Sequence, residues 1–357
     1  MEKNKIALVT YSLSSGGLQR VVANSSFMFE ELGYQVHLFV LDTQIDYPFA
    51  GTIHQFKLDQ KGFLGKIKTY YKIKKSIKNI DCTLIIDHRY RLNWMTEVIW
   101  QKIIYNHEHV VNYIHSSNIL NYLFKSACLN KFLFKNRPMI CVSNGVRNIL
   151  HKDFYYLQAQ TIYNFVALNS SKSTDRLQNK YILSIARMDQ ENVKQVDVLL
   201  QCYAKSILPA NNINLVILGD GVRLQEMKNL AKSLNISHLV LFKGFEKDPS
   251  SYLEHAYFTI LTSKYEGLPT VLVESLLMKT PVISFDCKTG PNEIIIDRVN
   301  GLLIEDQNQN KLIEGMNELV SNEQLYLELK KNAYASTKKF SLESIKKEWV
   351  KLINGTH

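Results

Sequence analysis

Short apolar runs alternate with helical patterns along almost the whole of this 357-residue chain. Near-continuous apolar strands separated by helices are typical of parallel sheets covered on both faces. The runs fall into two sets, which predicts two doubly wound α/β domains. The predicted strands are 6–10, 36–41, 82–87, 110–115, 139–143 and 161–166 in the first set, and 181–186, 214–219, 239–244, 258–263 and 281–286 in the second. The predicted helices include 17–31, 64–79, 195–206, 222–235 and 269–279.

The length of the chain agrees with two domains, because 357 residues exceed one ordinary hydrophobic core. The polar, serine-rich stretch 167–180 has no apolar periodicity and is the predicted linker. The tail 341–353 is predicted as a last helix with Ile345, Trp349 and Ile353 on one stripe. Because this helix follows the completed second domain, we expect it to pack back on the first. The predicted boundaries are 1–170, 171–338 and 339–357.

Cysteine usage and hydropathy limit the classes of protein to which this chain can belong. The five cysteines are scattered, odd in number and never in CxxC spacing, which indicates a reduced protein without structural zinc. The chain has no run of eighteen apolar residues, so no membrane-spanning helix is predicted. The N-terminus lacks the pattern of a signal peptide. We therefore expect a cytoplasmic protein.

The formal charge of +10 favours acidic partners such as nucleotide phosphates, nucleic acid or an anionic membrane. Lysines concentrate in residues 61–80, where Ile67, Tyr70, Tyr71, Ile73 and Ile77 recur near helical spacing. This basic amphipathic helix is either a solvated surface helix or a segment that docks on anionic lipid headgroups at the inner face of the cell membrane. Nucleic acid is the weakest interpretation, because the chain has no recognised nucleic-acid-binding motif.

Three features suit a bound diphosphate. Gly16 and Gly17 follow the first strand and open a helix, where backbone amides and the helix N-terminus favour an anion. Arg187 ends a strand and Lys194 precedes a helix, so both cations lie at the carboxyl edge of the second sheet. Taken alone, the glycine pair is equally consistent with a plain tight turn, and each cation is better explained as a solvated surface charge.

The stretch EGLPTVLVE places Glu266 and Glu274 eight residues apart around a proline that starts a helix. Glu274 lies one and a half turns into an otherwise apolar helix, so it is expected to face the sheet edge. A carboxylate there can accept two hydrogen bonds from a vicinal diol such as a ribose, and Glu266 could meet a second polyol. The alternative is a carboxylate near the positive end of a helix dipole, which fits Glu266 better than Glu274.

The ordered series of motifs resembles the retaining glycosyltransferases of family 4. The series comprises GGLQR, YIHSSN (113–118), CVSNGV, IYNFV, SIARMD, LGDG, KGF, EGLPTVLVE, TGPNEII, NGLLI and FSLESI, and it runs almost end to end. The resemblance implies the GT-B fold, in which two Rossmann-like domains face a central cleft and a C-terminal helix returns to the first domain. It also implies a donor bound to the second domain and an acceptor bound to the first.

The resemblance assigns roles to individual residues. Glu274 would bind the donor ribose, Glu266 the transferred sugar, and Arg187 with Lys194 the diphosphate. Further donor contacts would come from the glycine turn and the backbone after Glu266, namely Gly16, Gly17, Gly267, Leu268 and Pro269. His115 would contact the donor sugar or its developing charge. The chain departs from the family in one respect, because Arg187 and Lys194 are seven rather than about five residues apart and Gln195 replaces a glycine.

A loop of the first domain, residues 87–93, carries His88, Arg89 and Arg91 as candidate acceptor contacts, with surface charge as the alternative. The resemblance further implies a metal-independent reaction without a cofactor, and the sequence has no DxD pair. TGPNEII resembles enzymes of lipopolysaccharide, capsule and lipid-linked oligosaccharide synthesis, which favours a UDP-hexose donor. The competing hypotheses are a UDP-sugar epimerase, a non-catalytic partner subunit and a nucleic-acid-binding protein.

Overall fold

The chain folds into two α/β units. The computed structural model describes residues 4–14, 16–58, 62–106, 108–154, 158–166 and 179–355. Unit 1 comprises residues 1–165 together with 342–357, and unit 2 comprises residues 166–341. Most of the linker predicted at 167–180 lies outside the described residues.

Unit 1 contains a seven-stranded sheet in the order β3-β2-β1-β4-β5-β6-β7, with every strand pair parallel. Its strands are β1 (Lys5–Thr10), β2 (Gln35–Val40), β3 (Thr52–Gln55), β4 (Leu84–Asp87), β5 (Val110–Ile114), β6 (Met139–Cys141) and β7 (Ala159–Thr161). Its helices are α1 (Gly17–Glu31), α2 (Gly62–Ile80), α3 (Trp94–Val98), α4 (Ala127–Phe134), α5 (Asn144–Asp153) and α13 (Leu342–Asn354). A π-helix, η1 (Ile99–Ile104), continues α3, and a 3-10 turn, η2 (Ile119–Asn121), follows β5.

Unit 2 contains a six-stranded parallel sheet in the order β10-β9-β8-β11-β12-β13. Its strands are β8 (Tyr181–Ile185), β9 (Asn214–Leu218), β10 (Val240–Gly244), β11 (Thr259–Leu261), β12 (Val282–Phe285) and β13 (Gly301–Ile304). Its helices are α6 (Val196–Lys205), α7 (Leu224–Ser233), α8 (Ser250–His255), α9 (Thr270–Leu277), α10 (Pro291–Ile294), α11 (Gln309–Ser321) and α12 (Glu323–Ala333), with 3-10 turns η3 (Pro209–Asn211) and η4 (Ala335–Phe340).

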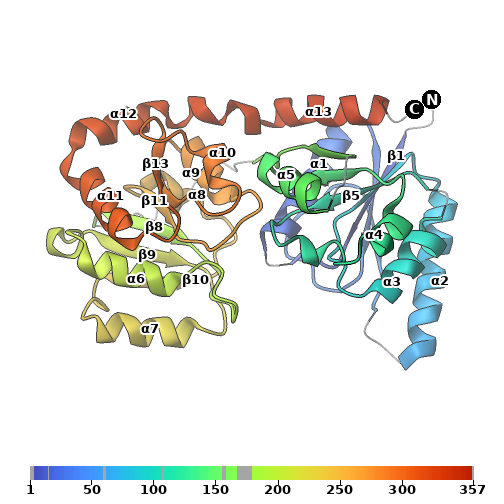
Figure 1. Cartoon of the computed structure of the whole chain (residues 1–357), viewed down its shortest axis with the longest axis horizontal. Coiled ribbons are helices and arrows are strands. Elements are labelled where there is room, and N and C mark those ends of the chain that lie inside the picture. The colour runs from blue at the N-terminus through green and yellow to red at the C-terminus, as the bar shows by residue number, and fades with distance from the viewer. Residues whose placement is uncertain are drawn as a thin grey trace. The chain divides into compact units, whose positions relative to one another are not determined.

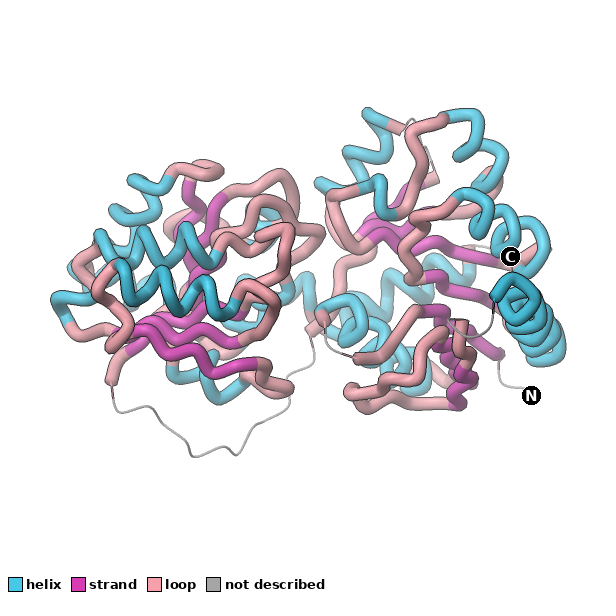
Figure 2. Tube along the Cα trace, turned by 90° about the horizontal axis from the view of Figure 1, so that it is seen from below, coloured by secondary structure: helices cyan, strands magenta, loops and turns pink. Residues whose placement is uncertain are grey.

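Both faces of the unit 2 sheet are buried, as near-continuous apolar strands predict. Along β8, Ile182 contributes to a core shared with α6, α7 and α11. Its neighbours Tyr181 and Leu183 point to the other face, where they pack with Leu253 of α8. In each unit the helices lie on both sides of the strands (Figure 1), and the parallel strands run side by side within each unit (Figure 2). The prediction of two doubly wound parallel sheets is therefore confirmed.

The C-terminal helix α13 belongs to unit 1 although it follows unit 2 in the chain. The ring of Trp349 packs edge-on against Phe29 of α1, with 5.2 Å between ring centroids. Ile345, Trp349 and Ile353 are all buried, so the predicted stripe is the face that packs. The apolar spacing of this tail therefore identified both the helix and its buried side.

The predicted basic helix is α2, and its apolar residues divide between two faces. Ile73 and Ile77 are fully buried, and Tyr70 packs against Trp100 of η1, with 6.2 Å between ring centroids. Ile67 and Tyr71, however, are 47% and 67% exposed. These two residues lie roughly 120° or more around the helix from Ile73 at 100° per residue, so they are not on its buried face.

Candidate functional site

The candidate site of unit 2 lies at the point where the strand order of its sheet reverses. The chain runs outward from β8 through β9 to β10, then returns to add β11 on the other side of β8. The loops 186–195 and 262–269 leave the carboxyl ends of these two neighbouring strands. In open α/β sheets, ligands bind in the crevice beside this switch point.

Lys194 and Glu266 meet between these two loops. The Lys194 ammonium donates to Glu266 Oε1 over 2.5 Å, and the side chains are 25% and 12% exposed. The two loops are also tied by their backbone, because Thr262 Oγ1 donates to the Lys194 carbonyl over 2.9 Å. Sequence reasoning named both residues separately and did not predict the pair. The signal available was only that each follows a strand end.

The 266–269 loop is held from the other side by residues 289 and 290. Thr289 Oγ1 donates to the carbonyl oxygen of Glu266. Gly290 has φ +98°, and a Cβ there would lie 2.6 Å from Pro269 Cδ, so this position requires glycine. The TGP motif thus supports the EGLP motif. Thr289 was not predicted as a site residue, although its motif had been singled out.

Glu274 lies on α9 and is only 5% exposed. Its neighbours Gly267, Leu268 and Pro269 are also buried, where the chain enters this helix. The expectation that Glu274 turns away from open solvent agrees with this position. A buried carboxylate on an otherwise apolar helix requires polar partners, because desolvation of an unpaired charge is costly.

Arg187 is the most accessible of the predicted site residues in unit 2. Its side chain is 72% exposed, and its guanidinium pairs with Asp189 over 3.0 Å. The segment between Arg187 and Lys194 contains one left-handed residue, Asn192 (φ +53°), and Gln195 (φ +46°) follows Lys194 in the same conformation. Gln195 is thus in a conformation that glycine adopts without strain. The extended loop still brings Lys194 to Glu266.

The sheet of unit 1 has its own switch point between β1 and β4. Gly16 caps the N-terminus of α1 with φ +150°, and its amide donates to the Tyr47 hydroxyl over 3.4 Å. Gly17 is the first residue of that helix, and a Cβ there would meet nothing within 4 Å. The predicted glycine turn therefore lies at the ligand-binding edge of its sheet, at the start of a 15-residue helix.

His115 follows β5 and pairs with His88, which follows β4. His88 Nδ1 and His115 Nε2 are 2.9 Å apart. Burial lowers the pKa of His88 to about 3, and burial together with His88 holds the pKa of His115 well below its usual value. Both rings are therefore neutral at pH 7, so His115 can offer a hydrogen bond but no positive charge.

The loop expected to contact an acceptor folds inward instead. Arg89 and Arg91 are fully buried, and His88 is 2% exposed. Arg89 donates to both carboxylate oxygens of Asp87, at 3.0 and 2.8 Å, and to Glu97 Oε1 at 3.1 Å. The three side chains are enclosed in this structure, which does not support their assignment as acceptor contacts.

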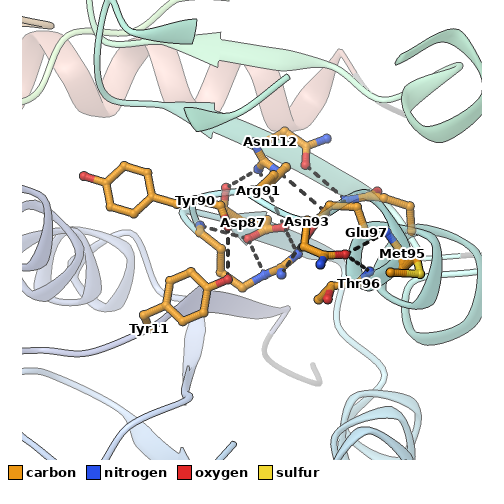
Figure 3. A network of polar contacts seen from close by, with 11 residues as sticks. Tyr11, Asp87, Tyr90, Arg91, Asn93, Met95, Thr96, Glu97 and Asn112 are labelled. Atoms are coloured by element: carbon orange, nitrogen blue, oxygen red, sulfur yellow. Dashed lines mark hydrogen bonds and ion pairs between the residues drawn. The ribbon is translucent and has the colours of Figure 1, made fainter. Parts of the chain in front are cut away.

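We call Asp87, Arg89, Arg91 and Glu97 the buried quartet (Figure 3). Arg91 Nη2 lies 3.6 Å from Asp87 Oδ2, and the Arg89 guanidinium stacks 3.7 Å from the centre of the Trp100 ring. Burial would raise the pKa of Asp87, but the two arginines more than offset this and lower it. The quartet matches two arginines with two carboxylates in the interior, and it fixes the loop after β4.

None of the described helices is long and apolar enough to cross a membrane. Within the described part of the chain, no group of three or more histidine, cysteine, aspartate or glutamate side chains is placed to hold a metal ion.

Residues 167–336 match the family model of glycosyl transferases group 1. The chain is 27% identical over 98% of its length, and 100% of the relative's, to the N-acetylgalactosamine-N,N'-diacetylbacillosaminyl-diphospho-undecaprenol 4-alpha-N-acetylgalactosaminyltransferase of Campylobacter jejuni. It is 28% identical, over 70% of its length and 52% of the relative's, to the poly(ribitol-phosphate) alpha-N-acetylglucosaminyltransferase of Staphylococcus aureus.

Solved structures share the fold of the whole chain. A mutant of S. aureus TarM, crystallised with fondaparinux, alpha-GlcNAc-glycerol and UDP, superposes with a TM-score of 0.79 at 17% identity, covering 99% of this chain and 100% of TarM. Together with the two parallel sheets, this likeness shows the architecture. The chain has the GT-B fold, its residues 167–336 match the group 1 glycosyltransferase domain, and its relatives support a glycosyltransferase.

Proposed function

We propose that this protein is a retaining, metal-independent family 4 enzyme that transfers a hexose or N-acetylhexosamine from a UDP-sugar. The acceptor is a lipid-linked or polymeric glycan of the cell envelope. The names of the relatives support this class of acceptor, since one acts on an undecaprenol-linked sugar and another on poly(ribitol-phosphate).

The observation that carries the proposal is the Lys194–Glu266 ion pair at the switch point of the unit 2 sheet. A diphosphate that binds between these two loops finds the Lys194 ammonium already positioned, with the exposed Arg187 in the same loop after β8. Glu266 then serves the transferred sugar and Glu274, on α9, the ribose hydroxyls. Binding exchanges the contact between Lys194 and Glu266 for a contact of Lys194 to the diphosphate and one of Glu266 to the adjoining sugar.

The reaction breaks the bond between the anomeric carbon and the diphosphate oxygen, and forms a bond from that carbon to the acceptor hydroxyl oxygen. The proton of the hydroxyl passes to the leaving diphosphate on the same face of the sugar, which retains the stereochemistry without a covalent nucleophile. Lys194 and Arg187 stabilise the negative charge that develops on the diphosphate. The protein acts mainly by positioning and electrostatics.

A membrane-borne acceptor would bring the enzyme to an anionic surface. Helix α2 supports this part of the proposal, because Lys66, Lys68, Lys72, Lys75 and Lys78 are all exposed on it. Lysines near an anionic bilayer each contribute roughly 1 kcal/mol of attraction. We therefore propose that the enzyme is a peripheral protein at the inner face of the cell membrane.

The test is nucleotide release from a panel of UDP-, GDP- and ADP-sugars, with and without EDTA. We expect release from one UDP-sugar, indifferent to EDTA and lowered at least about 100-fold in Glu274→Ala, because removal of ribose contacts weakens both binding and alignment of the donor. Glu254→Ala, an exposed carboxylate on the neighbouring helix α8, is the matched control and should release nucleotide at the wild-type rate.

Two outcomes would contradict the proposal. Release that requires a divalent cation would remove metal independence. No release from any donor, together with no nucleotide-induced rise in melting temperature, would favour a non-catalytic partner subunit.

A further inference from the structure

Three large apolar side chains are exposed to solvent at the start of α3. Leu92, Trp94 and Met95 are 74%, 52% and 56% exposed. Single exposed apolar residues are normal on protein surfaces, but three within four consecutive residues form a patch that calls for a partner. We call these three residues the apolar tip.

The apolar tip is held firmly outward. On one side the buried quartet fixes Arg89 and Arg91, and the Arg91 amide donates to the Asn121 carbonyl over 2.7 Å. Within the tip, the Asn93 side chain accepts from the amides of Met95 and Thr96 and so starts the helix (Figure 3). Both ends of the segment are anchored, so the apolar side chains cannot fold inward without breaking these contacts.

The elements beside the tip expose apolar groups as well. Trp100 of η1 packs on Tyr70 of α2, so α2 lies beside the helix that continues the tip. On α2 the exposed apolar residues are Ile67 and Tyr71, one turn apart. On η1 the exposed apolar residue is Ile103, and Lys102 lies 4.7 Å from the ring centre of the exposed Phe132 on α4. Exposed apolar residues thus also occur on α2, η1 and α4, and η1 packs against both other helices.

The charge of this surface is almost entirely positive. Residues 62–135 contain ten lysines, and each is exposed or half-buried: Lys66, Lys68, Lys72, Lys74, Lys75, Lys78, Lys102, Lys125, Lys131 and Lys135. Of the four acidic residues in this range, Asp87 and Glu97 are buried in the quartet, which leaves only Asp81 and Glu108. Within residues 62–135, the fold therefore buries two of the four carboxylates and leaves the lysine ammonium groups accessible.

A protein partner fits this surface poorly, because protein interfaces are depleted in lysine. An anionic bilayer fits it well, since tryptophan prefers the headgroup zone, leucine and methionine enter the acyl region, and lysines reach the phosphates. We propose that the apolar tip inserts into the interface of an anionic phospholipid bilayer, with the surrounding lysines on the headgroups. The inference rests on the proposed function in one respect: the enzyme would meet its lipid-linked acceptor at this bilayer.

Trp94 is a native probe of this insertion. The other two tryptophans, Trp100 and Trp349, are buried, so Trp94 is the tryptophan of this chain that can change from water to lipid. With vesicles of phosphatidylethanolamine and phosphatidylglycerol, we expect a blue shift of its emission and quenching by doxyl-labelled lipid. Trp94→Phe should keep binding to the vesicles and lose both spectral changes.

Binding itself is measured by co-sedimentation of the full-length protein. The triple variant Leu92→Ser, Trp94→Ser, Met95→Ser should partition at least about tenfold more weakly, because three apolar insertions are lost. Leu327→Ser, an equally exposed apolar residue on α12 of unit 2, is the matched control and should bind like wild type. High salt or vesicles of phosphatidylcholine alone should also weaken binding, since the lysine contacts are electrostatic.

No spectral shift with anionic vesicles would overturn the inference. So would a wild-type dimer, seen by sedimentation without lipid, that the triple variant disperses, because a second copy would then cover the tip. Nucleotide release in solution separates the two proposals. Nucleotide release by the triple variant at the wild-type rate would show that its donor site is intact. Loss of release in Glu274→Ala tests the donor site alone and does not bear on the apolar tip.

Discussion

Arg89 is the residue on which unit 1 depends most for its buried charges. Its guanidinium is the direct partner of Asp87 and Glu97 and stacks on Trp100, all in the interior of the unit. Replacement of Arg89 by methionine keeps most of the side-chain volume but removes one of the two positive charges beside the buried carboxylates. We expect Arg89→Met to lower the free energy of unfolding by about 3–5 kcal/mol, the usual cost of breaking a buried pair from one side.

Tryptophan emission in a urea titration measures this loss in unit 1, because all three tryptophans belong to that unit. Lys346→Met removes a surface pair with Glu31 in the same unit and is expected to cost no more than about 1 kcal/mol. Equal effects of the two substitutions would mean that the buried quartet contributes no more than a surface pair.

Among the elements, helix α9 carries the candidate ribose contact and ends on a strained residue. Lys279 has φ +60° just after the helix, and its amide donates to the Leu276 carbonyl over 3.0 Å. This is the position where helices commonly end with glycine. We expect Lys279→Gly to stabilise the end of α9 by about 1 kcal/mol, because glycine adopts the left-handed conformation without the Cβ penalty.

Hydrogen exchange followed by mass spectrometry measures this effect on the α9 peptide, where protection should rise roughly fivefold. Lys279→Ala keeps the Cβ and is the matched control, with protection close to wild type. Equal protection in both variants would show that the backbone at this residue is not strained.

The whole molecule depends on a helix that is remote in the chain. Deletion of residues 342–357 removes Ile345, Trp349 and Ile353 from the core of unit 1. At roughly 1.5–3 kcal/mol for each buried large side chain, unit 1 should lose about 5 kcal/mol or more and unit 2 should keep its stability. Emission of the remaining tryptophans measures the stability of unit 1, and hydrogen exchange measures the stability of unit 2. Glu348→Ala, exposed on the same helix, is the control.

The fold was largely predictable because local patterns and global packing agree in this chain. Apolar runs of β-branched residues identified ten of the strands at nearly their observed positions. β3 was missed because its four residues, TIHQ, include a single apolar one, and β13 was noted only as part of the NGLLI motif. The predicted strand 161–166 is wrong in extent, since β7 ends at Thr161 and the Tyr113 hydroxyl instead donates to the Ile162 carbonyl and Asn164. Short strands receive their register from neighbours, which spacing along the chain does not contain.

By itself, the sequence determined two parallel sheets, the C-terminal helix with its buried stripe, and the strand ends that carry Arg187, Lys194 and Glu266. Periodicity and strand-to-helix turns are local, so these features can be read without contacts. Tertiary structure alone decided that Lys194 meets Glu266, that Arg89 and Arg91 turn inward, and that Leu92, Trp94 and Met95 turn outward. Whether a charged or apolar side chain is buried depends on partners distant in the chain, and charge and hydropathy along one loop do not reveal them.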